Sequence, residues 1–310
     1  MAVTVNGSRL ALQGEEEALS DGERFVALGD NCVDHYRALG VRAAGGNAVN
    51  VAVNWARAGL RSGYMGAVGP DPDGDLLRTE IAAQGVDVSR LHTLDGATGV
   101  TLIELTADGE RVLAHEDFGV TADYRPDAAD LDFAAGAAIA HCSTLTDFRA
   151  AVLGLAQRGV PVSYDFSTRH ELEGLTGIDV AFYSWEATAD DGARALLRQA
   201  LAGGARHAVV TCGRHGSLAG SAEEIVFVPA REVEVVDTLG AGDSYIAAFL
   251  RALLERRPLI ECAARGTDAA AECCGRFGGF PQAATAAVSA AVEQAGSVAT
   301  KQRRTDDGDK

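Results

Sequence analysis

The stretch Asp237-Thr238-Leu239-Gly240-Ala241-Gly242-Asp243-Ser244 decides the fold of this chain. An alternating apolar segment, Val233 to Val236, precedes it, and an apolar segment from Tyr245 to Leu254 follows it. This order predicts a strand, a glycine-containing loop and a helix. The first amides of a helix have no partner within the helix, and the helix dipole adds positive charge there. The loop is therefore predicted to bind an anion.

A carboxylate, Asp243, falls in the same predicted turn as the anion site. A base beside an anion site suits phosphoryl transfer to a hydroxyl group. The alternative is that Asp243 only caps the helix, because aspartate is a preferred capping residue. Capping explains one aspartate but neither the glycines nor Asp237 at the end of the predicted strand. We therefore favour phosphoryl transfer.

The composition narrows the choice of partners. The chain has 310 residues, a formal net charge of −17 and 47% hydrophobic residues, which is typical of a globular protein. An acidic surface repels nucleic acid and anionic lipid, so neither is expected as a partner. We find no apolar stretch long enough to span a membrane and no signal-peptide pattern at the N-terminus. A cytoplasmic protein is expected.

Lysine is nearly absent, with Lys301 and Lys310 as its only two occurrences. A Walker A loop, a protein-kinase ATP site and a pyridoxal Schiff base each need an internal lysine, so all three are excluded. Phosphate would have to be bound by arginine, backbone amides and a metal ion. The six cysteines show no Cys-x-x-Cys spacing and are expected to be reduced.

Strand–helix alternation predicts an α/β fold with a central, mostly parallel sheet flanked by helices on both faces. Ligands of such sheets bind beyond the carboxyl ends of the strands. The expected strands are 24–29, 63–68, 137–141, 160–165, 179–183 and 207–211, and the expected helices are 48–58, 73–84, 147–157 and 190–201.

A second, smaller sheet is predicted from a hairpin formed by residues 100–105 and 111–114, with a turn at Asp108-Gly109. A lone hairpin is unstable, so it needs partner strands. We expect a small β lid built from about residues 33–44 and 98–118. The main domain is expected to cover residues 24–285, after an N-terminal extension (1–23) and before a C-terminal peripheral helix and tail (286–310).

Several motifs occur in a family-specific order. Asp237 to Asp243 matches the pattern DTxGAGD in full, Gly45-Gly46-Asn47 matches a Gly-Gly-Asn element, and Thr211 to Ser217 is similar to a TxGxxG nucleotide loop. From Arg24 to Pro281 the chain thus resembles the PfkB (ribokinase-like) family of carbohydrate kinases. The resemblance implies a Rossmann-like body with a small β lid over a sugar, and ATP and Mg²⁺ as cofactors.

Roles follow from the resemblance residue by residue. Asp243 resembles the general base, next to an anion hole formed by the amides of Gly240, Ala241 and Gly242. The residues that resemble sugar contacts are Asp34, Asp30, Gly45, Gly46, Asn47 and Asn50. The nucleotide would contact Thr211, Gly213, Gly216, Thr238 and Gly278, with the adenine near residues 270–278. Asp237, with Thr238, Arg276 and Gly278, resembles a monovalent-cation site, for which K⁺ is the expected ion.

Two departures from the family pattern concern phosphate and metal. The family's DPNxR stretch is here Asp165-Phe166-Ser167-Thr168-Arg169, and we assign Arg169 to the γ-phosphate because arginine supplies bidentate donors. The alternative is a surface arginine after a strand. The family's NxxE element is out of register near Ser184-Trp185-Glu186-Ala187, so how Mg²⁺ is held stays open, with Glu186 acting through water as one solution.

The segments 29–36 and 45–53 together resemble the fructoselysine 6-kinases of this family, which implies a fructosamine as acceptor at its 6-position. The acceptor's amine would face a carboxylate such as Asp30, Glu104 or Asp123, although Asp30 could equally bond local backbone. Another ketose or a sugar acid, a nucleoside, and a non-catalytic sugar sensor stay open as alternatives. A homodimer through the lid also stays open, because exposed sheet edges favour covering.

Overall fold

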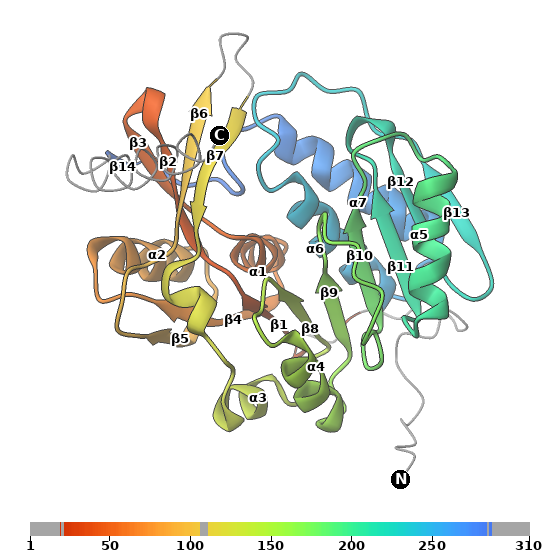
Figure 1. Ribbon diagram of the computed structural model, residues 1–310, viewed down its shortest axis with the longest axis horizontal. Helices are drawn as coiled ribbons and strands as arrows, with labels where there is room; N and C mark the ends of the chain where they lie inside the picture. The colour runs from red at the N-terminus through yellow and green to blue at the C-terminus, as the bar shows by residue number, and fades with distance from the viewer. Residues whose placement is uncertain (1–18, 20–21, 106–110, 284, 287–310) are drawn as a thin grey trace, which may run out of the picture.

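The computed structural model describes residues 19, 22–105, 111–283 and 285–286. In this part of the chain nine strands form one sheet, in the order β13-β12-β11-β10-β9-β8-β1-β4-β5 (Figure 1). Their bounds are β1 (Arg24–Gly29), β4 (Arg61–Val68), β5 (Asp87–Thr93), β8 (Ile139–Ser143), β9 (Val162–Asp165), β10 (Val180–Ser184), β11 (His207–Thr211), β12 (Ser217–Gly220) and β13 (Ile225–Val228).

The sheet is parallel from β5 to β11, and only β12 and β13 run antiparallel to their neighbours. The inner strands are buried on both sides, as expected for a parallel sheet covered by helices. The carboxyl ends of its parallel strands therefore meet at one edge, where the lid also lies (Figure 1). The predicted α/β architecture is confirmed.

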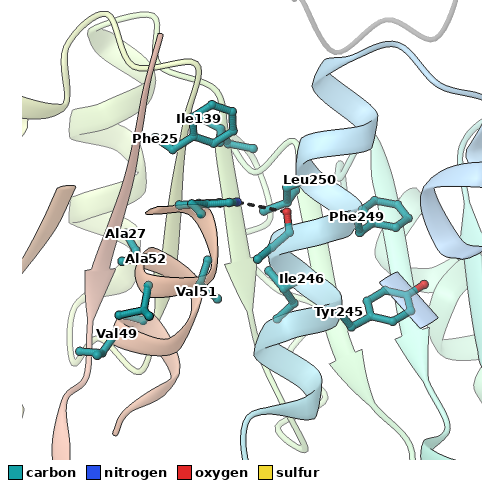
Figure 2. Close-up of a cluster of buried hydrophobic side chains, with 14 of the residues drawn as sticks. Phe25, Ala27, Val49, Val51, Ala52, Ile139, Tyr245, Ile246, Phe249 and Leu250 are labelled. Carbon is teal, nitrogen blue, oxygen red and sulfur yellow. Dashed lines mark hydrogen bonds between the residues drawn. The ribbon is translucent and has the colours of Figure 1, made fainter. Parts of the chain in front are cut away.

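Helices cover both faces of this sheet. One face carries α1 (Asn47–Arg57), α2 (Pro72–Ala83), α6 (Ala241–Leu254) and α7 (Leu259–Cys274), and the other carries α3 (Ala128–Ala134), α4 (Phe148–Gln157) and α5 (Asp191–Ala202). Between α1 and α6, Val51 points toward Ile246 (Figure 2). The indole of Trp55 also donates a hydrogen bond to the Ala247 carbonyl (3.1 Å). This packing holds the starts of α1 and α6 together.

The helix starts differ in how they are capped. Helices α2 to α5 each begin after an aspartate whose side chain accepts a hydrogen bond from an amide of the first turn. Helices α1 and α6 instead follow Gly46 and Gly240, which have no side chain to offer, while α7 follows Pro258, also without a side-chain cap. Because uncapped first-turn amides need another acceptor, the two starts that follow glycine are where an external anion or a distant side chain fits.

The predicted lid is confirmed as a second sheet, in the order β14-β3-β2-β6-β7 for the described residues (Figure 1). Its strands are β2 (Cys32–Tyr36), β3 (Val41–Gly45), β6 (Val100–Leu105), β7 (Arg111–Asp117) and β14 (Thr285–Ala286). Short 3₁₀ turns follow β2, β7 and β11, at η1 (Arg37–Leu39), η2 (Gly119–Asp123) and η3 (Gly213–His215).

Some sequence predictions need correction or cannot be compared. The expected strand at residues 233–236 is wrong, since these residues are irregular and Val233, Val235 and Val236 are 41%, 59% and 52% exposed. Ala286 belongs to a strand, so the boundary placed after residue 285 cuts β14. The Asp108-Gly109 turn, nearly all of the N-terminal extension and residues 287–310 lie outside the described residues.

Candidate active site

The start of α6 contains two glycines that serve different purposes. Gly240 has a φ of +76°, and a Cβ there would approach the Cα of Gly279 to 2.5 Å, so the backbone itself requires glycine. A Cβ on Gly242 would meet nothing within 4 Å beyond its chain neighbours and the backbone of its own helix, and Gly242 lines a large cavity. Packing therefore does not explain Gly242, whereas a ligand that approaches the backbone closely does.

The amides at this helix start are not equally available. The Ala241 amide donates to the Thr238 carbonyl (3.2 Å), and the first helical bond runs from the Ser244 amide to the Gly240 carbonyl (2.9 Å). Gly242 and Asp243 lie between these, in the first turn, where amides have no acceptor within the helix. The anion site stays a prediction, and the Gly242 amide is more available for it than the Ala241 amide.

Asp243 is 6% exposed and does not cap α6. Its carboxylate accepts a hydrogen bond from the Asn50 side-chain amide of α1 (2.7 Å). Burial raises the pKa of Asp243 well above its ordinary value, against the Asn50 hydrogen bond, and the charges of three other aspartates add to the rise: Asp165, Asp30 and Asp34. A raised pKa makes the carboxylate a stronger base, which suits proton abstraction from a hydroxyl.

Five carboxylates converge at this edge of the sheet, all less than a tenth exposed: Asp30, Asp34, Asp165, Asp237 and Asp243. Burial, opposed by a hydrogen bond from the Cys32 thiol, raises the pKa of Asp34 to about 7, with further rises from Asp237, Glu116 and Asp30. Burial also raises the pKa of Asp165 to about 6, against a hydrogen bond from the Ser167 amide. Such clusters of shifted pKa values are typical of functional sites.

Asp30 holds backbone rather than facing an open space. Its carboxylate accepts hydrogen bonds from the amides of Asn47 (2.8 Å) and Ala48 (3.4 Å) and from the Ser143 hydroxyl (2.7 Å). It therefore supplies the cap that Gly46 cannot give to α1. Of the two readings that the sequence allowed for Asp30, these contacts favour the structural one.

The other predicted sugar contacts lie beside Asp243 and Asp30. A Cβ on Gly45 would overlap the Asp34 carboxylate, so glycine makes room for that side chain. Gly46 has a φ of +111° and passes close to the backbone of Asn31. Asn47 begins α1, and Asn50 lies one turn further along it. The structure thus brings these residues together around one point.

A cavity of about 550 Å³ opens on the other side of the α6 start. The predicted nucleotide residues Thr211, Gly213, Gly216 and Thr238 line it, together with Ala270 and Cys274 of α7. Val233 and Val235 line it as well, so their alternation reflects contact with this cavity and not a strand. That these valines line a cavity was not predicted from the sequence, although their alternating spacing was a visible sign that one face is in contact with something.

Gly278 binds Asp237 rather than lining the large cavity. Its amide donates to the Asp237 carboxylate (2.8 Å), which also accepts from the Leu239 amide (3.0 Å). The hydrogen bond between Gly278 and Asp237 joins the loop before α6 to the segment after α7. A monovalent cation at Asp237 stays a prediction.

Arg169 lies apart from the large cavity. It is exposed and lines a second cavity of about 190 Å³, with Phe118, Thr121 and Thr144 among its neighbours. Its charge lowers the pKa of Asp165, which places it near the acidic cluster. The contact with a γ-phosphate stays a prediction, and Arg169 is not among the residues that line the large cavity with Thr211 and Gly242.

Comparison with known proteins identifies the family. The family model described as "pfkB family carbohydrate kinase" matches residues 31–285. The chain belongs to the pfkB family of carbohydrate kinases. It is therefore a phosphotransferase that acts on a sugar hydroxyl, and the resemblance seen in its motifs is confirmed.

Individual relatives agree with this assignment. Fructoselysine 6-kinase of Shigella flexneri is 35% identical over 252 residues, which cover 80% of this chain and 96% of the relative. Fructosamine kinase FrlD of Bacillus subtilis is 30% identical over 264 residues, which cover 83% and 93%.

Solved structures share the fold of this pfkB-family chain. Arabidopsis thaliana ribokinase complexed with ribose and ATP has a TM-score of 0.72 at 21% identity, covering 83% of this chain and 94% of that one. A structure from E. coli, described as a ribokinase II in complex with ATP and Mg²⁺, has a TM-score of 0.70 at 19% identity with the same coverage. In the described residues we find no helix with the length and apolar character needed to cross a membrane.

Proposed function

We propose that this pfkB-family kinase transfers the γ-phosphoryl group of ATP to the 6-hydroxyl of fructoselysine or a related fructosamine. One observation carries the proposal: the buried Asp243 carboxylate lies in the first turn of α6, beside the Gly242 backbone that borders the large cavity. A base and an anion site in one turn suit attack of a hydroxyl on a phosphoryl group.

The large cavity fits a nucleotide. Ala230, Val233, Ala270 and Ala271 provide apolar surface for a base, and Gly242 leaves backbone open for phosphate. Within the described residues no three His, Cys, Asp or Glu side chains form a metal cluster. Mg²⁺ in nucleotide sites is held mostly by phosphates, waters and one or two carboxylates. Exposed Glu186, two residues after the cavity-lining Ser184, would hold it through water.

The chain's own residues then account for the chemistry. When bound, Mg²⁺ supplies positive charge at the phosphates. Asp243, held by Asn50, takes the proton of the acceptor hydroxyl, while the Gly242 amide and the α6 dipole stabilise negative charge on the phosphoryl group. Asp34 and Asn50 bind other hydroxyl groups of the sugar.

The fructosamine is supported by the relatives. Two curated relatives that are at least 30% identical over most of this chain act, by name, on fructoselysine or on fructosamines. The concentration of buried carboxylates around Asp243 fits an acceptor that carries an amine, because an alkylamine is positively charged at neutral pH.

The test is ADP release by the full chain with ATP and Mg²⁺ over a panel of acceptors: fructoselysine, smaller fructosamines, fructose, ribose and adenosine. We expect kcat/KM to be highest for a fructosamine. A preference for fructose or for adenosine would reject the proposed acceptor while keeping the kinase. No ADP release with any sugar, under conditions in which the protein is folded, would reject sugar phosphorylation by this chain.

A further inference from the structure

A polar row crosses the lid sheet on one face. Asp34 of β2 pairs in register with Thr101 of β6, and Thr101 pairs in register with Glu116 of β7. Side chains of residues paired across neighbouring strands point to the same side of a sheet. We call Asp34, Thr101 and Glu116 the acidic row. It extends over roughly 10 Å, because neighbouring strands lie about 4.8 Å apart.

The acidic row faces the start of α6. Tyr36, two residues after Asp34 and thus on the same face, packs its ring on Phe277 (4.3 Å between centroids), in a cluster that includes Leu239 of the α6 loop. His35, on the opposite face, lies 3.5 Å from Asp73 of α2 instead. The register therefore directs Glu116 toward the site, although Glu116 lies far from Asp243 in the sequence.

The charge of the acidic row is not neutralised by the protein. Glu116 raises the pKa of Asp34, and burial together with Asp30 raises the pKa of Glu116. Among the residues that the structure describes, no arginine or histidine forms an ion pair with Asp34 or Glu116. The arginines of β3 and η1 are engaged elsewhere, Arg42 with Asp73 and Arg37 with Glu104 (3.3 Å). Glu116 is exposed, so a ligand can reach it.

An independent observation points to a ligand at this place. The side-chain oxygen of Asn50 has no hydrogen-bond partner, although Asn50 is only 3% exposed. The amide nitrogen of the same side chain binds Asp243, so the oxygen belongs to the same site. A buried acceptor without a donor is costly, and a hydroxyl group of a bound sugar would supply one.

We propose that Glu116 selects acceptors with a positive charge by binding the protonated amine that is attached to the sugar. The inference rests on the proposed function and adds the residue that distinguishes a fructosamine from a neutral ketose. It replaces the candidates that the sequence suggested for this role, because Asp30 binds backbone, Glu104 pairs with Arg37 and Asp123 lies in η2, outside the strands that carry the acidic row.

The test compares Glu116→Gln with Glu104→Gln, which removes the same charge from the opposite face of the lid sheet. KM is measured for fructoselysine and for fructose at saturating ATP. For Glu116→Gln we expect the KM for fructoselysine divided by the KM for fructose to rise about tenfold, because the ion pair with the amine is lost. Glu104→Gln should leave the ratio unchanged. Thermal unfolding verifies that both variants are folded.

Salt provides a second measurement. Since ions screen a partly exposed pair, the KM of the unmodified chain for fructoselysine should rise with ionic strength more steeply than that of Glu116→Gln. An unchanged KM ratio in Glu116→Gln, or an equal rise in Glu104→Gln, would overturn the role of Glu116. If the unmodified chain phosphorylates fructose and not fructoselysine, the proposed acceptor itself is wrong, which is a different outcome.

Discussion

The two sides of the α6 start bind their ligands by different means. The large cavity is lined by glycines and alanines, with backbone accessible at Gly213, Gly216 and Gly242, and its charged lining residues are Arg214, Arg231 and Glu232. The acceptor side instead holds five buried carboxylates and the exposed Glu116. Phosphate is a ligand common to all kinases of this kind, and backbone amides suffice for it. Discrimination between acceptors depends mainly on side chains, which give each site its own pattern of charge and hydrogen bonding.

The largest effect is expected where the two sides meet. Asp243→Asn removes the base while keeping the shape, so kcat should fall by about a hundredfold or more, with a much smaller change in KM for either substrate. Steady-state kinetics with fructoselysine and ATP measure this. Retention of most of the activity would show that Asp243 does not abstract the proton.

Substitutions at the two glycines of the loop should distinguish an effect on ATP binding from an effect on stability. Gly242→Val places a side chain in the open space above the first-turn amides, so kcat/KM for ATP should fall roughly tenfold to a hundredfold without a loss of thermal stability. The matched variant Gly240→Ala should lower Tm instead, because a φ of +76° and the approach to Gly279 oppose a Cβ. Equal loss of stability in both variants would contradict the distinction.

A substitution at Arg169 tests whether this side chain acts on the acceptor or on the nucleotide. Because it lines the second cavity near Asp165, we expect Arg169→Met to raise KM for the acceptor several-fold and to leave KM for ATP nearly constant. Contact with the γ-phosphate, as the motif suggested, would instead lower kcat by about tenfold or more. Steady-state measurements of kcat and of KM for the acceptor and for ATP decide between these outcomes.

The smallest effect concerns stability without ligands. Burial raises the pKa of Asp34 to about 7 in the folded chain, against about 4 when unfolded. The folded state therefore binds this proton more tightly, and stability from Asp34 is lost as pH rises from about 4 to 7.

Asp34→Asn removes this loss, so its Tm relative to the unmodified chain should increase by a few degrees between pH 5 and pH 8. The difference between variants is the useful quantity, because burial lowers the pKa of His141 and His207 and gives the opposite pH dependence. Asp95→Asn, at an exposed carboxylate, serves as the control. A difference in Tm that does not vary with pH would contradict the assigned shift.

The sequence predicted those helices, strands and turns whose pattern lies within one short continuous segment. The parallel strands β8 to β11 followed from strand–helix alternation, and the lid followed from the hairpin pattern in residues 100–114. The alternating valines at 233–236 led to a wrong prediction of a strand. The same alternation arises when one side of an irregular segment lines a cavity. Gly278 and Asp30 were assigned to ligands, and the structure shows them binding other parts of the chain.

The sequence by itself determined the glycine loop with its aspartate, because the backbone conformation and the base lie within eight consecutive residues. Only the tertiary structure decided that Asn50 orients Asp243, that Arg169 lines a separate cavity and that Glu116 joins Asp34. These relations depend on how distant strands and helices align. A register or packing contact between segments far apart in the chain is set by the whole core, and no short stretch of sequence contains it.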